Sequence, residues 1–364
     1  MPKAVAAQNT PDAVRALIIL MNTANPNIPS AQLIAQDVDS WQTVMANAIH
    51  TPEALISRLK LDPAALDAAY PGHRQFAVRV PEPYLSRIEL GNLDDPLLKQ
   101  ILPVADEGAP APAGYGPDPL AEAHANKAPG IVHKYKSRVL LIANGACAIN
   151  CRYCFRRHFP YSDNRLGRHE WDQALEYVRA NPDINEVILS GGDPLMSTDA
   201  RLDTIISSIE NIPHVTRLRI HTRLPIVIPQ RITEALISRL ETSRLAVIMV
   251  VHVNHANEID EHVGHSLARL FKHGIHVLNQ SVLLKGINDR VDALSQLSER
   301  LFEYKVLPYY LHILDRVSGA HHFEVSDAHA KSLMDELQGT LPGFLVPKLV
   351  REEAGAHSKT LIYP

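Results

Sequence analysis

The stretch VLLIANGACAINCRYCFRRHFPY, residues 139–161, contains all three cysteines of this 364-residue chain. It begins with the apolar run expected of a buried strand and continues into a loop that carries Cys147, Cys151 and Cys154. A small, odd and clustered set of cysteines argues against a disulfide framework. The stretch therefore predicts a metal or redox site in the loop that follows a strand.

Short apolar runs alternate with amphipathic stretches from Arg138 onward, a pattern typical of βα units and a mostly parallel sheet. We expect strands over residues 139–143, 186–190, 215–220, 245–251, 276–278 with its flanks, and 306–314. We expect helices over residues 170–180, 200–209, 231–240, 258–273 and 292–304, with Gly274 ending the fourth of them. These alternations predict a partial or full (β/α) barrel with its functional groups at the carboxyl ends of the strands.

The chain before the barrel divides at the segment GAPAPAGYGPDP, residues 108–119. Because proline removes N–H donors and glycine adds backbone freedom, this segment can hold neither a helix nor a central strand. Helical signals begin at Asp12, Ser30 and Thr51, the last of which precedes a proline at the first helical position. We therefore expect a helical region over residues 1–107, a linker or wrapping segment over 108–130, the barrel over 131–340 and a C-terminal segment over 341–364.

The composition, with 46% apolar and 21% charged residues, is that of an ordinary globular protein. The longest apolar run, residues 245–251, is too short to cross a bilayer, and the N-terminus lacks the apolar core of a secretory signal. We therefore expect a cytoplasmic protein without a membrane partner. The net charge of −4 provides no basic field for nucleic acid, so we expect small-molecule partners.

Two kinds of metal site are compatible with the cysteines themselves. Three thiolates suit a [4Fe–4S] cluster in which one iron stays open, whereas a structural zinc needs a fourth ligand, which His158 would supply. A rival of another class is a nucleic-acid-binding metal knuckle that uses Arg152, Arg156 and Arg157. The acidic net charge and the strand context argue against this rival.

The order CxxxCxxC after the first barrel strand resembles the signature of radical S-adenosylmethionine (SAM) enzymes, whose open iron binds the amino and carboxylate groups of SAM. Further segments resemble the lysine 2,3-aminomutase family, and most of all its short branch, which makes β-lysine for the modification of translation elongation factor P. Those segments are SGGDPL, HTRLPIVIPQRIT, LNQSVLLKGIND, PYYLHILD and LVPKLVREEAGAHSKT. The resemblance covers about residues 94–360 and implies an α/β fold, a partial (β/α)6 barrel of the radical SAM type with a helical N-terminal region.

The resemblance also implies a SAM site. It assigns Gly191, Gly192 and Asp193 to the amino group of SAM, and His252 and Gln280 to further contacts with SAM. By themselves, the glycines are equally compatible with an ordinary turn after a strand. A lone His or Gln at a strand end is more often a structural hydrogen-bonding group.

A site for pyridoxal 5′-phosphate (PLP) is implied in the same way. The resemblance assigns Lys359 to the Schiff base with PLP, Lys134 and Arg138 to its phosphate, and Tyr135 to its ring. Lys134 stands where the long aminomutases have Arg. Without the resemblance, Lys359 and the segment around Tyr135 are more simply interpreted as solvated surface.

For the substrate, the resemblance assigns Arg156 to the α-carboxylate, and Asp315 and Glu352 to the distal ammonium group. Glu352 stands where the long aminomutases have Asp. Arginine is an alternative substrate within the class, whereas glutamate would meet two like charges. The chain also lacks the additional zinc-binding cysteines of the long enzymes.

The implied activity is that of an isomerase, an intramolecular aminotransferase. An electron from a flavodoxin- or ferredoxin-like donor enters the cluster and cleaves SAM, and the resulting radical starts the migration of the amino group of L-lysine from C2 to C3. The implied product is (R)-β-lysine, which a ligase attaches to elongation factor P. The chain contains no GxSxG, HExxH or P-loop pattern that would point to a different chemistry.

Overall fold

The structure is a computed structural model and describes residues 40–122, 126–128, 130–161 and 167–363. The helices expected from Asp12 and Ser30 lie outside these residues. Within the described residues, no helix has the length and apolar character needed to cross a membrane.

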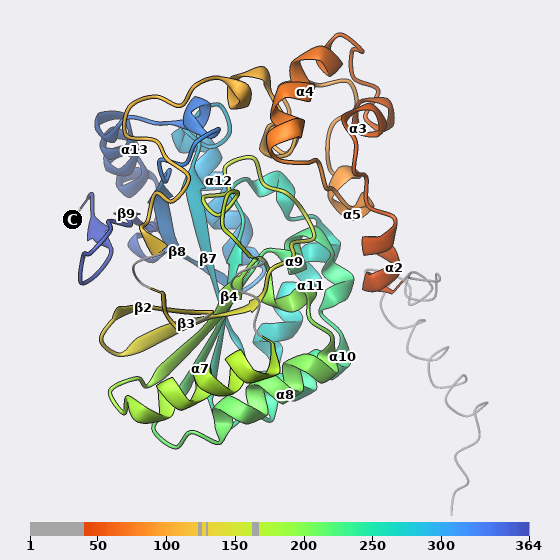
Figure 1. Cartoon of the computed structure of the whole chain (residues 1–364). Helices are drawn as coiled ribbons and strands as arrows, with labels where there is room; N and C mark the ends of the chain where they lie inside the picture. Colours follow the sequence, from red (N-terminus) through yellow and green to blue (C-terminus); the bar gives the residue numbers. More distant parts are fainter. Residues whose placement is uncertain (1–39, 123–125, 129, 162–166, 364) are drawn as a thin grey trace, which may run out of the picture. The chain divides into compact units, whose positions relative to one another are not determined.

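The strands of the described chain form one sheet in sequential order, β1 to β10 (Figure 1). Each strand pairs in parallel with the next through β3 (Arg138–Asn144), β4 (Glu186–Gly191), β5 (Arg217–Thr222), β6 (Ala246–His252), β7 (His276–Leu283), β8 (Val306–Ile313) and β9 (Lys348–Arg351). β1 (Asn126–Ala128) and β2 (Ile131–Tyr135) extend one edge antiparallel, and β10 (Thr360–Leu361) extends the other. Since β1 and β10 remain as separate edges, the barrel is partial, as the family resemblance implies.

The helices between the parallel strands cover the outside of this sheet (Figure 1). They are α7 (Arg168–Ala180), α8 (Asp199–Glu210), α9 (Leu224–Val227), α10 (Glu234–Glu241), α11 (Glu261–Lys272), α12 (Val291–Glu303) and α13 (Asp327–Thr340). The six predicted strands and five predicted helices of the barrel are all present, with boundaries shifted by a few residues. α13 and β9 were not predicted; their Leu333, Leu337 and Leu349 share a second apolar cluster with residues of β7, α12 and β8.

Local sequence explains where the helices begin and end. The Asp260 side chain accepts the N–H of Val263 and caps the start of α11. Gly274, at φ +75°, follows the end of the same helix in the left-handed region, which confirms its predicted role. The side chain of Thr51 caps α3 (Pro52–Arg58), also as predicted.

A helical layer precedes the barrel in the chain. It consists of α2 (Trp41–Ala46), α3, α4 (Ala65–Gln75) and α5 (Glu82–Leu85), and its apolar side chains belong to the same buried core as those of the barrel strands. The expected linker or wrapping segment, 108–130, contains no helix or strand over residues 109–121 but includes β1, and its Gly116 exchanges main-chain hydrogen bonds with Arg316 and Ser318. Short 3-10 helices complete the described fold: η2 (Leu98–Gln100), η3 (Ala105–Gly108), η4 (Pro194–Met196), η5 (Pro229–Arg231), η6 (Ala256–Glu258), η7 (His321–Phe323) and η8 (Gly343–Leu345).

Candidate active site

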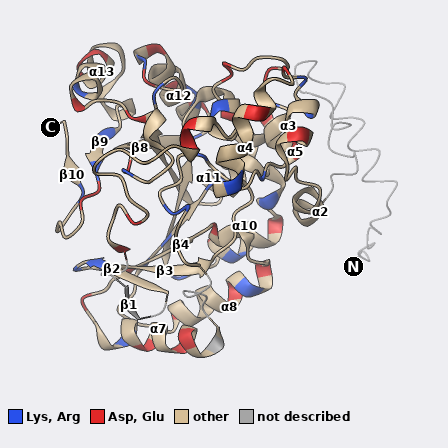
Figure 2. Ribbon diagram, turned by 45° about the horizontal axis from the view of Figure 1, so that its top comes forward, with Lys and Arg blue, Asp and Glu red and all other residues tan. Residues whose placement is uncertain are grey.

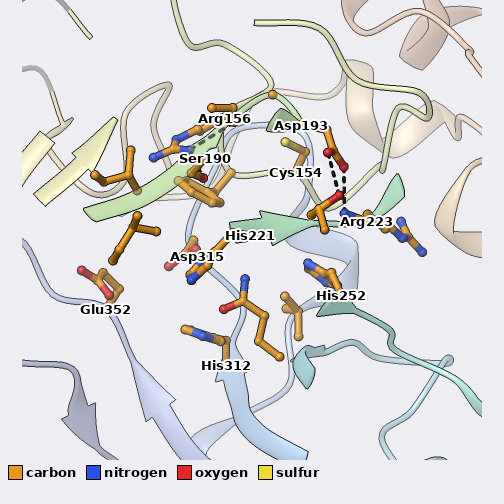
Figure 3. A pocket seen from close by; sticks show the side chains of 18 of the residues that line it. Cys154, Arg156, Ser190, Asp193, His221, Arg223, His252, His312, Asp315 and Glu352 are labelled. Carbon is orange, nitrogen blue, oxygen red and sulfur yellow. Dashed lines mark hydrogen bonds between the residues drawn. The ribbon is translucent and has the colours of Figure 1, made fainter. Parts of the chain in front are cut away.

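A cavity of about 550 Å³ runs along the inside of the barrel to the loops at the carboxyl ends of the strands. Every residue that the sequence assigned to a cofactor or to the substrate lines it, and Figure 3 shows several of them pointing inward. These residues are Lys134, Tyr135, Arg138, Cys147, Cys151, Cys154, Arg156, Gly191, Gly192, Asp193, His252, Gln280, Asp315, Glu352 and Lys359. The fold thus brings separate predictions into one site.

Two glycines at the end of β4, Gly191 and Gly192, contact the backbone at the start of the cysteine loop closely. Gly191 has φ +123°, and a Cβ atom there would lie 2.4 Å from the Asn144 carbonyl oxygen. A Cβ atom on Gly192 would lie 2.6 Å from the Ala146 carbonyl oxygen. The Gly192 N–H also donates to Asn144, across 2.8 Å. Any side chain at these positions would push the cysteine loop away.

Asp193, which follows the two glycines, connects the glycine loop to the end of β5 and the residues after it. Its carboxylate accepts hydrogen bonds from the Leu195 N–H (3.0 Å), the Thr222 hydroxyl (2.7 Å), the Arg223 N–H (2.8 Å) and the Leu224 N–H (3.0 Å). Burial raises the pKa of the Asp193 carboxyl above its usual value, although these hydrogen bonds oppose the shift. The carboxylate therefore joins the glycine loop to the start of α9.

The three thiols line the same cavity, although no group of three or more His, Cys, Asp or Glu side chains among the described residues is placed to hold a single metal ion. Three thiolates still suit a [4Fe–4S] cluster, because each binds a different iron. Burial, followed by the neighbouring Cys154, raises the pKa of Cys147, and burial raises the pKa of Cys154 to about 11. A bound cluster would remove this penalty because thiolates that ligate a metal are deprotonated outright. His158 is exposed, and its Nε2 atom lies 3.2 Å from the Ser318 carbonyl oxygen, so it is not oriented as a fourth zinc ligand.

The proposed PLP end of the cavity joins opposite edges of the sheet. Lys359, just before β10, is ion-paired with Glu352, just after β9. Tyr135, at the end of β2, donates to the same carboxylate across 2.7 Å, and Lys134 Nζ lies 3.7 Å from it. The Arg138 guanidinium stacks on the Tyr135 ring, 4.0 Å from its centroid. Two lysines and a tyrosine hydroxyl thus contact one carboxylate, and Arg138 stacks on the ring of that tyrosine.

Arg156 has a partner that was not predicted. Its Nε and Nη2 atoms each donate across 2.8 Å to Glu122, and its Nη1 donates to the Ser190 hydroxyl (3.2 Å) and the Gly191 carbonyl oxygen (3.1 Å). Both partners of the Arg156–Glu122 pair are buried. Glu122 follows a Pro-rich segment without any marker of function, so only the fold reveals its position.

Asp315 lies in the cavity wall, where removal from water raises the pKa of its carboxyl to about 7. Lys359 and Lys134 oppose this shift, and Glu352 and Glu122 add to it. A carboxyl group in this environment gains strongly from a cationic ligand, as expected for a group that binds an ammonium ion.

Further polar side chains of the cavity were also missed. Arg219 lines the cavity and is paired with Glu186. His221 and His312 face the centre of the cavity together with the predicted His252 (Figure 3). Burial lowers the pKa of all three histidines, that of His252 to about 4, so the cavity holds neutral imidazoles. The Nε2 atoms of His221 and His252 are buried without a hydrogen-bond partner among the described residues, which suits a polar ligand.

The two other arginines of the cysteine loop are structural. Arg152 and Arg157 both pair with the Glu107 carboxylate, and none of these three side chains is exposed. Figure 2 shows basic and acidic residues interspersed along the outer helices. The metal-knuckle alternative is therefore wrong, because the arginines it requires are buried and neutralised.

Comparisons with known proteins show what this chain is similar to. Residues 141–297 match the family model of the radical SAM superfamily. The chain is 50% identical to an L-lysine 2,3-aminomutase of Escherichia coli over 323 residues, which cover 88% of this chain and 94% of the relative. It is 35% identical to an L-lysine 2,3-aminomutase of Clostridium subterminale, across 90% of this chain and 79% of the relative. A solved radical SAM methyltransferase from Sphaerobacter thermophilus, 15% identical, aligns with a TM-score of 0.46 over 61% of this chain and 68% of that chain.

Proposed function

Because the chain belongs to the lysine 2,3-aminomutase family of radical SAM enzymes, we propose that it is an isomerase that moves the amino group of L-lysine from C2 to C3. The observation that carries this proposal is the single cavity in which the cysteine loop, the glycine loop, Lys359 and Asp315 meet. When bound, the [4Fe–4S] cluster and SAM supply the radical, and PLP carries the amino group during its migration. The residues of the chain bind and orient these groups.

The carboxyl ends of the strands are proposed to hold the cluster and SAM. Cys147, Cys151 and Cys154 ligate the cluster. The family resemblance assigns the amino group of SAM to the glycine loop, in which the Asp193 carboxylate, the Gly191 carbonyl oxygen and the Gly192 N–H already have partners within the protein. His252 pairs in register with Gln280 on the neighbouring strand, so both side chains reach the same part of the cavity.

The PLP site is proposed to lie near Lys359, between the two edges of the sheet. Lys134 and Arg138 supply cations for the phosphate, and Arg219 adds a third cation to the same cavity. Tyr135 is held by Glu352 and by the Arg138 guanidinium, so its ring is fixed before the cofactor binds. A preorganised site of this kind lowers the entropic cost of binding.

The substrate is proposed to lie across the cavity, with its α-carboxylate at Arg156 and its distal ammonium group at Asp315 and Glu352. Two carboxylates at the distal end favour a cationic side chain and disfavour glutamate. An arginine side chain would satisfy the same two carboxylates, and arginine is therefore the alternative substrate. We further propose, from the likeness to the short branch, that the product is (R)-β-lysine for a ligase acting on elongation factor P in the cytoplasm, with a flavodoxin- or ferredoxin-like donor.

The decisive experiment is an anaerobic assay after reconstitution with iron and sulfide. Lysine or arginine is incubated with SAM, PLP and a reductant, and the amino acids are then separated by chiral chromatography. We expect β-lysine from lysine, and none from a Cys151→Ala variant that lacks one cluster ligand. Unchanged lysine together with β-arginine would instead support the alternative substrate.

A further inference from the structure

Arg223, the first residue after β5, carries a buried guanidinium that reaches the cysteine loop. Its Nη1 atom donates to the Sγ atom of Cys151 across 2.7 Å. The side chain is 7% exposed and lies between the rings of Tyr84 and Tyr153, each with its centroid 5.5 Å from Cζ. A cation held between two aromatic rings has little freedom to leave the thiol.

The opposite side of the guanidinium is anchored as well. Nη2 donates across 2.7 Å to both Glu258 and Gln100. The Glu258 carboxylate is fully buried and accepts the N–H groups of Asn254 (2.8 Å) and His255 (3.1 Å). Because Glu258 is held by main-chain donors, it fixes Arg223 in its position against Cys151.

This arrangement has an electrostatic consequence for a cluster on Cys151. Reduction adds one electron to the cluster, and a hydrogen bond to a ligand sulfur stabilises the added negative charge. The effect is large inside a protein because the local dielectric constant is low. Glu258 acts in the opposite direction, because its negative charge partly cancels that of the guanidinium.

We propose that Arg223 sets the reduction potential of the [4Fe–4S] cluster through its hydrogen bond to Cys151, with Glu258 as the opposing charge. Arg223 makes the one-electron reduction of the cluster by the flavodoxin- or ferredoxin-like donor easier. It acts through Cys151 as a positioning residue and does not contact the substrate. This inference rests on the proposed function only for the presence of the cluster.

The test is an electrochemical titration of reconstituted protein, monitored by electron paramagnetic resonance, without SAM or lysine. We expect a lower potential for Arg223→Gln, which loses both the charge and the bond to Cys151. We expect a higher potential for Glu258→Gln, which leaves the cation without its anion. Tyr84→Phe serves as the matched control, because it keeps the ring beside Arg223 and removes only a hydroxyl that makes two long contacts, 3.4 Å from Arg223 Nη2 and 3.5 Å from the Leu97 carbonyl oxygen; its potential should equal that of the wild type.

Opposite shifts in the two variants support the proposal, since a general disturbance of the fold would not reverse sign between them. Unchanged potentials, or shifts of the same sign, in variants that contain four irons would overturn it. If Arg223→Gln does not fold, Glu258→Gln alone tests the proposal. A reduction potential of Glu258→Gln equal to that of the wild type would then overturn it. Wild-type protein that binds no cluster would overturn the proposed function, whereas wild-type turnover with unshifted variants would overturn only the role of Arg223.

Discussion

The ammonium group of Lys359 and the carboxylate of Glu352 form an ion pair that connects the segments before β10 and after β9. Burial raises the pKa of Glu352, but Lys359, Tyr135 and Lys134 outweigh it and hold the pKa below its usual value. The carboxylate is therefore ionised at neutral pH and orients the Lys359 amine toward the cavity. The family resemblance makes Lys359 our candidate for imine formation with PLP, and the ion pair holds its amine in the wall of the cavity.

We expect Lys359→Ala to lose the visible absorbance of the PLP imine and all turnover, while the cluster spectrum stays unchanged. The amine is removed at one end of the cavity and the three cysteines lie elsewhere in it. Absorption spectra of reconstituted protein, with and without PLP, measure both signals. Lys348→Ala, which changes an exposed lysine of β9, is the control and should retain the imine band. An imine band in Lys359→Ala would assign the Schiff base to a different lysine.

Asp315 should make lysine binding depend on pH. Its pKa of about 7 in the unliganded site means that the carboxyl is increasingly protonated as the pH falls below about 7. The ε-ammonium group of lysine, with a pKa of about 10.4, stays charged throughout. The KM for lysine should therefore rise as the pH falls, and kcat should change less.

Asp315→Asn provides the comparison, because it keeps the shape of the side chain and removes its charge. We expect a KM higher by about tenfold or more at pH 8, which corresponds to about 1.4 kcal/mol or more of lost binding. This variant should also lose the pH dependence of KM. A wild-type pH profile that persists in Asp315→Asn would show that another group titrates.

Glu122→Gln should destabilise the substrate-free protein by about 3 kcal/mol, because it leaves the buried Arg156 guanidinium without an anion. The carboxylate of lysine then relieves that charge, so lysine should raise the Tm of the holoenzyme more in the variant than in the wild type. Thermal unfolding with and without lysine measures this. Glu234→Gln, which breaks an exposed pair with Arg269, should cost less than about 1 kcal/mol. An equal lysine-induced shift in variant and wild type would place the substrate carboxylate away from Arg156.

Gly192→Ala should reduce bound iron severalfold while the barrel stays folded. The added methyl group would lie 2.6 Å from the Ala146 carbonyl oxygen and displace the loop that begins the cysteine segment. Iron analysis and circular dichroism after reconstitution measure the two properties. Gly339→Ala in α13, where a Cβ atom meets no atom within 4 Å, should bind iron normally. Full iron content in Gly192→Ala would contradict the close contact of the two loops.

The barrel was predictable because its strands are apolar runs and its helices have capped, periodic faces. α13 carries the same signals, since the Ser326 side chain caps it and Ala330, Leu333 and Leu337 have helical spacing. β9 is a short strand whose partner, β8, precedes it by a whole helix, so only the folded chain shows their pairing. Sequence patterns describe near neighbours well and distant pairings poorly.

The site residues differ in the same way in how far sequence predicts them. The cysteine spacing and the segment around Lys359 are local patterns, and they identify residues whose side chains can bind a cofactor directly. Glu122, Arg219 and Arg223 gain their importance from partners 30 or more residues away, for example Arg223 from Cys151, 72 positions earlier. No local pattern specifies such a pair. The Asp193 carboxylate illustrates the converse, because a residue inside a recognisable segment serves mainly to hold the loop.

Glu107 forms ion pairs with both Arg152 and Arg157, and this shared carboxylate limits where the chain can be divided into separately expressed parts. Glu107 lies in η3, which follows the helical layer in the chain, whereas both arginines belong to the cysteine loop of the barrel, and none of the three side chains is exposed to solvent. A barrel expressed alone would contain two guanidinium groups stripped of their shared anion, directly beside the cluster ligands. Chimeras and truncations should therefore be cut before the helical layer, so that this layer and the barrel stay in one chain.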